Sequence, residues 1–332
     1  MKDLTIIVGT VGQSVMRSAD SGKSWERIGP RRGFPYEALV RCLAVHPREP
    51  RVLFAGTERG LYRSDDAGGH WRFIDSALNP YYIWSLAIDP VEPEVMFAGT
   101  GTPTPATIFR STDGGKSWEK RPVEVAAECE NVGTPRVTGI AIDPEDRRNL
   151  WMGLEVDGAR QSTDRGETWT DVDVVHQKDV HNVVVTSGPP KTVFIVCNRE
   201  IYKSTDNAAT WETLGMQKNV PWEYPRSQTY LRGIAVQPSR PGTLFLGIGD
   251  ATPGTAGGVA RSSNLGGNWE MLPLPAQPNT TVWTFGTHPA DPGIIFAASR
   301  FGYLYRSDSG GDSWTKLARE FSEIAAVRWL PG

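Results

Sequence analysis

The chain has 332 residues, of which 35 are Lys or Arg and 38 are Asp or Glu, so its net charge is −3. This balance excludes the strongly basic footprint of a general nucleic-acid or membrane-surface binder. Only three cysteines are present, which argues against a disulfide framework and predicts a reducing, cytoplasmic location. The N-terminal run at 4–10 predicts a β-strand rather than a secretory signal, and no apolar run is long enough to span a membrane.

A short motif recurs seven times along the chain. Its pattern is Ser-x-Asp-x-Gly-x-x-Trp, as in RSTDGGKSWEK at 110–120, and successive copies lie 42 to 58 residues apart. That interval suits one four-stranded antiparallel sheet with its turns, the repeating unit of a β-propeller. The tryptophans that end the seven copies are Trp25, Trp71, Trp118, Trp169, Trp211, Trp269 and Trp314.

Each repeat contains four strand-like runs in the same order. In the third repeat they are 85–90, 94–100, 107–113 and 116–121, separated by Gly, Pro and Asp residues that favour turns. No apolar period of 3.6 residues persists over a useful length, so we expect no substantial helix. The sequence therefore predicts an all-β protein.

The two ends of the chain predict how the ring closes. The chain starts with the second strand of a repeat, and residues 323–331 match a first strand that no other strands follow. We expect this C-terminal strand to join residues 1–28 and complete the N-terminal blade, which leaves few free sheet edges. The prediction is one domain, residues 1–332, forming a seven-bladed β-propeller.

The repeated motif resembles the Asp-box, or BNR, repeat. The residues that carry the resemblance in the third copy are Ser111, Asp113, Gly115 and Trp118. Similar propellers occur in sialidases, xyloglucanases, sortilin-type proteins and photosystem assembly factors. Three copies depart from the pattern, with Ala208 in place of Gly, and Asn264 and Ser309 in place of Asp. The resemblance implies that the Asp-box turns lie away from the functional face.

The longest insertions in the repeats are predicted on the face opposite the Asp-box turns. Long insertions fall at 99–107, 122–136, 215–230 and 247–258, which are the connections predicted to lie on that face. Insertions gathered on one face of a repeat protein are typical of a binding face.

Stacking the seven predicted inner strands places polar and aromatic residues at one mouth of the central channel. Guanidinium groups suit planar anions such as carboxylates, and aromatic faces suit sugar rings. The predicted ligand-binding residues are Arg41, Tyr82, Trp84, Arg136, Tyr230, Arg232 and Trp283. The position two residues after Arg41, Trp84, Arg232 and Trp283 is apolar in all seven inner strands, and we expect it to form an apolar layer that lines the channel. Its members are Leu43, Leu86, Ile140, Val183, Ile234, Phe285 and Val327.

Acid–base candidates come from two segments near this mouth. The segment 176–182 offers Asp179 and His181, and the insertion at 215–230 offers Glu223. His176, Asp179 and His181 could ligate a metal, but the segment does not offer three convincing ligands. We therefore predict no metal and no other cofactor. Further carboxylates that could complete the pair that a glycosidase needs are Glu155, Asp157, Asp250 and Glu323.

Two family activities are disfavoured by the pattern. Sialidase propellers have six blades and an Arg-Ile-Pro motif before the first box, whereas this chain has RIGP at 27–30, after its first box. Xyloglucanase carboxylates face a cleft between two propellers, and only one propeller is predicted here.

Two hypotheses about function remain open. The first is a pocket for an anionic or sugar-like small molecule or carbohydrate, with hydrolase or lyase activity. The second is a non-catalytic scaffold that binds a protein partner, because a fold alone does not dictate a function. Neither involves nucleic acid or a membrane.

Overall fold

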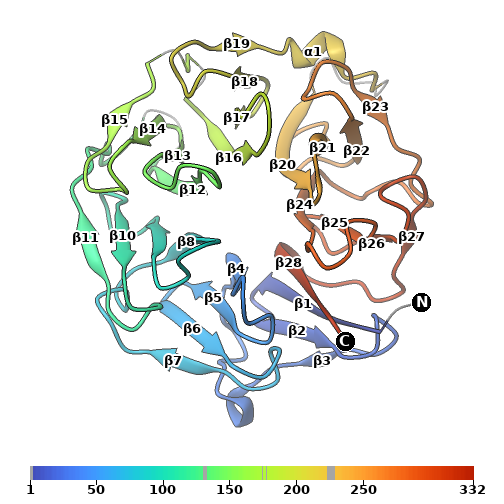
Figure 1. Ribbon diagram of the computed structural model, residues 1–332. Helices are drawn as coiled ribbons and strands as arrows, with labels where there is room; N and C mark the ends of the chain where they lie inside the picture. Colours follow the sequence, from blue (N-terminus) through green and yellow to red (C-terminus); the bar gives the residue numbers. More distant parts are fainter. Residues whose placement is uncertain (1–2, 130–132, 174, 177, 223–228) are drawn as a thin grey trace.

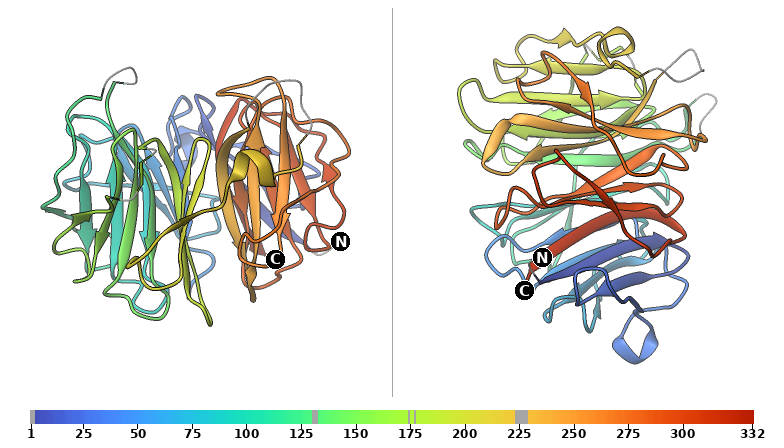
Figure 2. Two further views of the ribbon diagram at one scale, coloured as in Figure 1. Left: turned by 90° about the horizontal axis from the view of Figure 1, so that it is seen from above. Right: turned by 90° about the vertical axis from the view of Figure 1, so that its right-hand side faces the viewer.

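A computed structural model describes residues 3–129, 133–173, 175–176, 178–222 and 229–332. Seven four-stranded sheets are arranged in a ring, as Figure 1 shows, and the views in Figure 2 show the ring from its sides. This confirms the predicted all-β, seven-bladed propeller. Residues of the inner strands line a cavity in the central channel. Among the described residues, no helix has the length and apolar character needed to cross a membrane.

The blades follow one another along the chain, each with its first strand innermost. Blade 1 contains β28 (Glu323–Pro331), β1 (Leu4–Val11), β2 (Val15–Ser18) and β3 (Glu26–Arg27). Blade 2 contains β4 (Cys42–Val45), β5 (Leu53–Thr57), β6 (Gly60–Ser64) and β7 (Arg72–Ile74). Blade 3 contains β8 (Ile83–Ile88), β9 (Met96–Thr100), β10 (Ile108–Ser111) and β11 (Glu119–Arg121). Blade 4 contains β12 (Arg136–Ile142), β13 (Leu150–Glu155), β14 (Gly158–Ser162) and β15 (Thr170–Asp171).

The remaining three blades have the same order. Blade 5 contains β16 (Val180–Thr186), β17 (Thr192–Cys197), β18 (Ile201–Ser204) and β19 (Glu212–Thr213). Blade 6 contains β20 (Tyr230–Gln237), β21 (Arg240–Gly249), β22 (Gly257–Ser262) and β23 (Glu270–Met271). Blade 7 contains β24 (Val282–Gly286), β25 (Ile295–Ser299), β26 (Leu304–Ser307) and β27 (Thr315–Lys316). A short helix, α1 (Met216–Asn219), and a 3-10 turn at Pro30–Arg32 lie outside the sheets.

The C-terminal strand closes the ring as predicted. β28 pairs antiparallel with β1 from Leu4 opposite Pro331 to Val11 opposite Glu323, with one register shift between Gly9 and Thr10. The first and the last strand of the chain therefore lie side by side in blade 1 (Figure 1). The pairing removes the free inner edge that β1 would otherwise expose.

The Asp-box turns hold themselves together by side-chain to backbone hydrogen bonds. In the third box, Ser111 Oγ accepts from the Gly115 N–H at 2.9 Å, and Asp113 Oδ1 accepts from the Ser117 N–H at 2.9 Å. The Trp118 indole donates to the Gly115 carbonyl at 3.0 Å, which fixes the ring over the turn. These bonds account for the constant spacing of the motif.

The three departures from the motif keep the turn geometry. Asn264 Oδ1 accepts from the Asn268 N–H at 2.9 Å, and Ser309 Oγ accepts from the Ser313 N–H at 2.9 Å, so both replace the Asp acceptor. Ala208 has φ 70°, the left-handed conformation that glycine adopts without cost at the equivalent position of other boxes.

Seven hydrophobic clusters form the core, one between each pair of neighbouring blades. Between blades 7 and 1, for example, Phe296 of β25 packs with Ile6 of β1 and with Trp329 of β28. Because each sheet buries both faces against its neighbours, only its innermost strand borders the channel.

The predicted apolar layer is partly wrong. Val183, Ile234, Phe285 and Val327 are buried between the blades and do not line the channel cavity. Each inner strand presents its edge, not one face, to the channel, so consecutive residues such as Trp84, Ser85 and Leu86 border the cavity together. A strict two-residue alternation therefore selected the wrong residues in several blades.

Candidate functional site

The predicted ligand-binding residues gather at one mouth of the channel. In blade 3, Ile83 pairs with Thr100 at this end of the sheet, whereas Ile88 and Ser111 both pair with Met96 at the other end, where the Asp box begins. The mouth is thus formed by the starts of the inner strands and the ends of the second strands. It lies opposite the Asp-box turns, as the resemblance implied.

Two glutamates hold four arginines at the mouth. Glu155, the last residue of β13, contacts Arg136 at 2.7 Å and Arg232 at 3.3 Å. Glu323, the first residue of β28, contacts Arg41 at 3.1 Å and Arg300 at 3.2 Å. The glutamates therefore link strands that lie far apart in the sequence.

Two tryptophans complete this arrangement. The Cζ atoms of Arg41 and Arg136 lie 4.6 and 4.8 Å from the ring centroid of Trp84. Those of Arg232 and Arg300 lie 3.9 and 4.6 Å from the ring centroid of Trp283. All four distances are within the range of cation–π attraction.

These contacts close into a circle that we call the arginine–tryptophan ring. In order around the mouth its members are Arg41, Trp84, Arg136, Glu155, Arg232, Trp283, Arg300 and Glu323. Four guanidinium groups and two carboxylates leave two positive charges in excess. The ring therefore presents a net positive, ordered surface suited to an anion.

The ring changes how the predicted aromatic residues would meet a ligand. Each indole is overlaid by two guanidinium groups, so a sugar approaching Trp84 or Trp283 meets charge before it meets an aromatic face. Tyr82 also contributes, because its hydroxyl accepts a hydrogen bond of 2.8 Å from Arg41 Nε.

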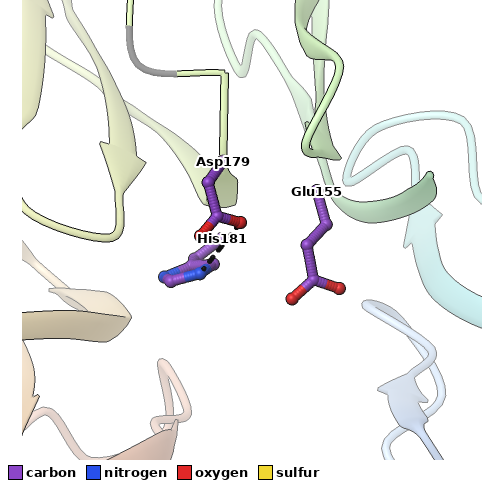
Figure 3. Close-up of side chains that lie close together, drawn as sticks. All are labelled: Glu155, Asp179 and His181. Carbon is purple, nitrogen blue, oxygen red and sulfur yellow. Dashed lines mark ion pairs between the residues drawn. The ribbon is translucent and has the colours of Figure 1, made fainter. Parts of the chain in front are cut away.

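A second cluster at the mouth is formed by Asp179, His181 and Tyr230. Nδ1 of His181 lies 2.6 Å from the Leu231 carbonyl oxygen, which can only accept, so Nδ1 carries the proton of the neutral imidazole. Nε2 then offers its lone pair to the Tyr230 hydroxyl at 3.2 Å. Asp179 Oδ1 lies 3.3 Å from the same Nε2, as Figure 3 shows, and this contact becomes an ion pair only when the imidazole gains a second proton.

Asp179 and His181, which are joined by the dashed line in Figure 3, differ in how far their side chains are exposed to solvent. The side chain of His181 is 0 % exposed, whereas that of Asp179 is 28 % exposed. A ligand at the mouth would therefore reach Asp179 directly and His181 only through its neighbours. Glu223, the third predicted catalytic residue, lies outside the described residues.

Charge at the mouth sets the protonation of these groups. Burial would raise the pKa of Glu155, but Arg232 and Arg136 outweigh it and hold that pKa below its ordinary value. Burial likewise opposes the lowered pKa of Asp179, which the His181 contact and the charge of Arg232 produce. Burial raises the pKa of Tyr230, so its phenol stays protonated. Both carboxylates are thus ionised at neutral pH.

Glu155, Asp179 and His181 are also the described residues that come closest to a metal site. One potential ligand atom from each lies within 4.8 Å of the others. However, both carboxylate oxygens of Glu155 contact arginines, and the charge of Arg232 would oppose a cation at this position. The donor set therefore fits a proton-transfer group better than a metal.

The pKa of His181 yields a testable pH dependence of stability. Burial lowers this pKa and Arg232 lowers it further, against the opposing effect of Asp179 and Glu155. In the unfolded chain His181 binds a proton at a pH of about 6.5, whereas in the folded chain it does so only at lower pH. The contribution of neutral His181 to the free energy of unfolding is therefore fully present above about pH 6.5 and is lost as the pH falls below it. His181→Asn is expected to flatten this loss between about pH 6.5 and 5, measured by urea unfolding at each pH. Equal slopes in the two proteins would contradict it.

Arg300 was not assigned from the sequence, and Glu155 was named there only as a further carboxylate for a glycosidase pair. Arg300 follows β25 directly, and Glu155 ends β13, so both lie at the ends of second strands. Stacking the first strands alone could not reveal them. A second stack, of the residues that end the second strands, would have placed both at the mouth.

The fold and its turns define the class of this molecule: it is a seven-bladed Asp-box β-propeller. Residues 109–120 match the BNR/Asp-box repeat family.

Among curated proteins, the chain is similar to xyloglucanases. It is 27% identical to xyloglucanase Xgh74A of Acetivibrio thermocellus over 254 residues, which cover 65% of this chain and 29% of that protein. It is 25% identical to a xyloglucanase of Paenibacillus sp over 272 residues, covering 67% of this chain and 25% of that protein. The chain thus spans less than a third of the length of these relatives.

Two solved structures share the fold. The GH74 xyloglucanase from Xanthomonas campestris matches with a TM-score of 0.65 at 21% identity, over 83% of this chain and 45% of that chain. YCF48 bound to D1 peptide matches with a TM-score of 0.57 at 18% identity, over 85% of this chain and 81% of that chain. These matches show that the chain shares its propeller fold with xyloglucanases and with YCF48.

Proposed function

We propose that the channel mouth binds a carbohydrate that carries a carboxylate and cleaves it by elimination. The similarity to xyloglucanases supports a carbohydrate ligand. The excess positive charge of the arginine–tryptophan ring supports an anionic one, and Arg136, whose side chain is 31% exposed, is the ring member best placed to meet it.

Elimination suits the protonation of the site better than glycoside hydrolysis does. Oxygens of Glu155 and Asp179 lie within 4.8 Å, near the separation of about 5 to 5.5 Å in a retaining glycosidase pair. Such a pair also needs one protonated carboxyl group as general acid, yet the pKa of each of these groups is lowered. The Asp179–His181–Tyr230 group, in contrast, contains a base, a relay and a protonated phenol.

The contacts of this group, at 3.3 and 3.2 Å around His181 Nε2, carry the proposal. Asp179 removes the proton from the carbon beside the sugar carboxylate, and the electron pair forms a carbon–carbon double bond as the β-carbon–oxygen bond breaks. Tyr230 gives its proton to the departing oxygen. The proton on Asp179 then passes through His181 to Tyr230, which restores the starting state. Arg136 stabilises the charge that develops on the substrate carboxylate.

The test uses the purified protein with uronate-containing oligosaccharides and with neutral xyloglucan. We expect cleavage of the uronates alone, seen as ultraviolet absorbance from the new conjugated double bond. Asp179→Asn is expected to lower kcat by about 10²- to 10⁴-fold, while Asp173→Asn, an exposed carboxylate of the same connection, leaves it unchanged. Release of reducing ends without new absorbance, or equal rates in the two variants, would contradict the proposal.

A protein-binding function is the second candidate, favoured by one comparison. YCF48, solved with a D1 peptide, is covered over 81% of its length, so it is a single propeller of similar extent. A peptide with a free carboxylate would also suit the positive mouth. Binding of such peptides at the mouth with no cleavage of any uronate would select this function over elimination.

A further inference from the structure

A cavity in the channel is lined at one end by members of the arginine–tryptophan ring, namely Arg41, Trp84, Arg232 and Trp283, and by His181. Its volume is about 210 Å³. Leu43, Leu86 and Ile140 from blades 2, 3 and 4 give it an apolar wall. Polar residues form most of the remaining lining, among them Asn182, Thr284 and Arg328 from blades 5, 7 and 1. The cavity is thus mainly polar and has one apolar wall.

Arg328 differs from the other arginines of the interior. Buried Arg160, Arg232 and Arg306 each contact at least one carboxylate. Arg328 has no carboxylate partner among the described residues, and no Asp or Glu is among the described residues that line the cavity. Arg328 is half-buried on the wall of the cavity, so its unpaired guanidinium group is available to an anion that enters the channel.

The hydrogen bonds of Arg328 leave part of its guanidinium group available. Nη1 donates to the Val327 carbonyl at 2.7 Å and to the Phe285 carbonyl at 3.3 Å, which orients the group. Nε and Nη2 have no acceptor within the described part of the chain. Burial lowers the pKa of Arg328, whereas a neighbouring carboxylate would raise it.

Two further polar groups face the same space. Asn182 uses its Oδ1 to accept from the Val183 N–H at 2.9 Å, and its amide nitrogen has no partner among the described residues. The Thr284 hydroxyl is likewise without a partner in the described ranges, and both residues line the cavity. These groups add an N–H donor and a hydroxyl donor to the lining of the cavity.

We propose that this cavity binds a small organic monocarboxylate, with its oxygens on Nε and Nη2 of Arg328 and its apolar part against Leu43, Leu86 and Ile140. Guanidinium groups bind carboxylates through two parallel hydrogen bonds. The volume exceeds the roughly 150 Å³ that accommodates benzene in an engineered apolar cavity, so an acid with a short branched or aromatic tail fits. An inorganic oxyanion would leave the apolar wall unused.

This site adjoins the proposed elimination centre, because His181 and part of the arginine–tryptophan ring also line the cavity. The proposed contacts of the monocarboxylate nevertheless use none of the proton-transfer groups Asp179, His181 and Tyr230. A variant that disables elimination is therefore expected to keep the cavity site, and the two proposals can fail independently.

The test is calorimetric titration of the protein with isobutyrate and benzoate, beside isobutyramide as the uncharged isostere and phosphate as the inorganic anion. We expect the carboxylates to bind at least tenfold more tightly than isobutyramide and phosphate, and to raise the Tm. Arg328→Met is expected to weaken isobutyrate binding at least tenfold without lowering the Tm of the ligand-free protein. Arg319→Met, at an exposed arginine, and Asp179→Asn are expected to bind isobutyrate like the unmodified protein.

Unchanged isobutyrate binding in Arg328→Met, or equal binding of isobutyramide or phosphate, would overturn the proposal. If Arg328→Met does not fold, Leu86→Phe decides the matter because it fills the space beside the apolar wall and leaves the arginine in place. Tight isobutyrate binding by Leu86→Phe would then contradict the site.

Discussion

Deletion of residues 323–332 is expected to leave the chain unable to form the native ring. These residues include β28, which pairs along the full length of β1 and buries Ile324, Val327 and Trp329. Without it, blade 1 loses its innermost strand, and the cores shared with blades 2 and 7 are opened. We expect the truncated protein to show no cooperative unfolding transition when tryptophan fluorescence is measured as a function of urea concentration.

A milder variant separates closure from a general effect of truncation. Trp329 is 1% exposed, and Trp329→Ala is expected to lower the free energy of unfolding by about 3 to 5 kcal/mol through lost burial and the cavity left behind. Phe301→Ala, at an exposed position in blade 7, is the control and is expected to change it by less than about 0.5 kcal/mol. A truncated protein with the original urea midpoint would show that β28 is dispensable.

Glu155→Gln is expected to lower the free energy of unfolding by about 3 to 5 kcal/mol, because it leaves two guanidinium groups without their shared carboxylate in a largely buried site. The side chain of Arg232 is only 8% exposed, so water cannot replace the lost charge there. The double variant Glu155→Gln with Arg232→Met is expected to recover much of the loss, since both members of the pair are then neutral.

The control for this prediction is an ion pair at the surface. Glu270 contacts Arg261 at 2.8 Å with its side chain 57% exposed, and Glu270→Gln is expected to cost less than about 1 kcal/mol. Urea unfolding of the unmodified protein, Glu155→Gln, the double variant and Glu270→Gln measures the change in the free energy of unfolding for each substitution. A loss in Glu155→Gln no larger than that in Glu270→Gln would mean that the ring contributes little to stability.

The fold was predictable because each blade repeats the same local chemistry. The hydrogen bonds of one box, between Ser111, Asp113 and their own turn, involve residues four apart, so their spacing is visible in the sequence. Ring closure was predictable from which strand comes first and which comes last.

The site was less predictable because its contacts join distant residues. Glu155 contacts Arg136, 19 residues away, and Arg232, 77 residues away, and no local pattern encodes either distance. Arg328 was missed because its neighbour Val327 has the residue type expected for the channel, although Val327 is buried between blades. Which of two adjacent side chains borders the channel depends on how the strand edge is turned.

The arginine–tryptophan ring has a consequence for how selective the mouth is. Each long arginine side chain is already immobilised on an indole and a carboxylate during folding, at a cost of up to about 2 kcal/mol of rotamer entropy apiece. A ligand therefore does not have to order these arginine side chains when it binds, but the side chains also cannot change conformation to fit a ligand of a different shape. Discrimination between guests is therefore governed by the fixed spacing of the guanidinium groups, which only the geometry of the whole propeller can alter.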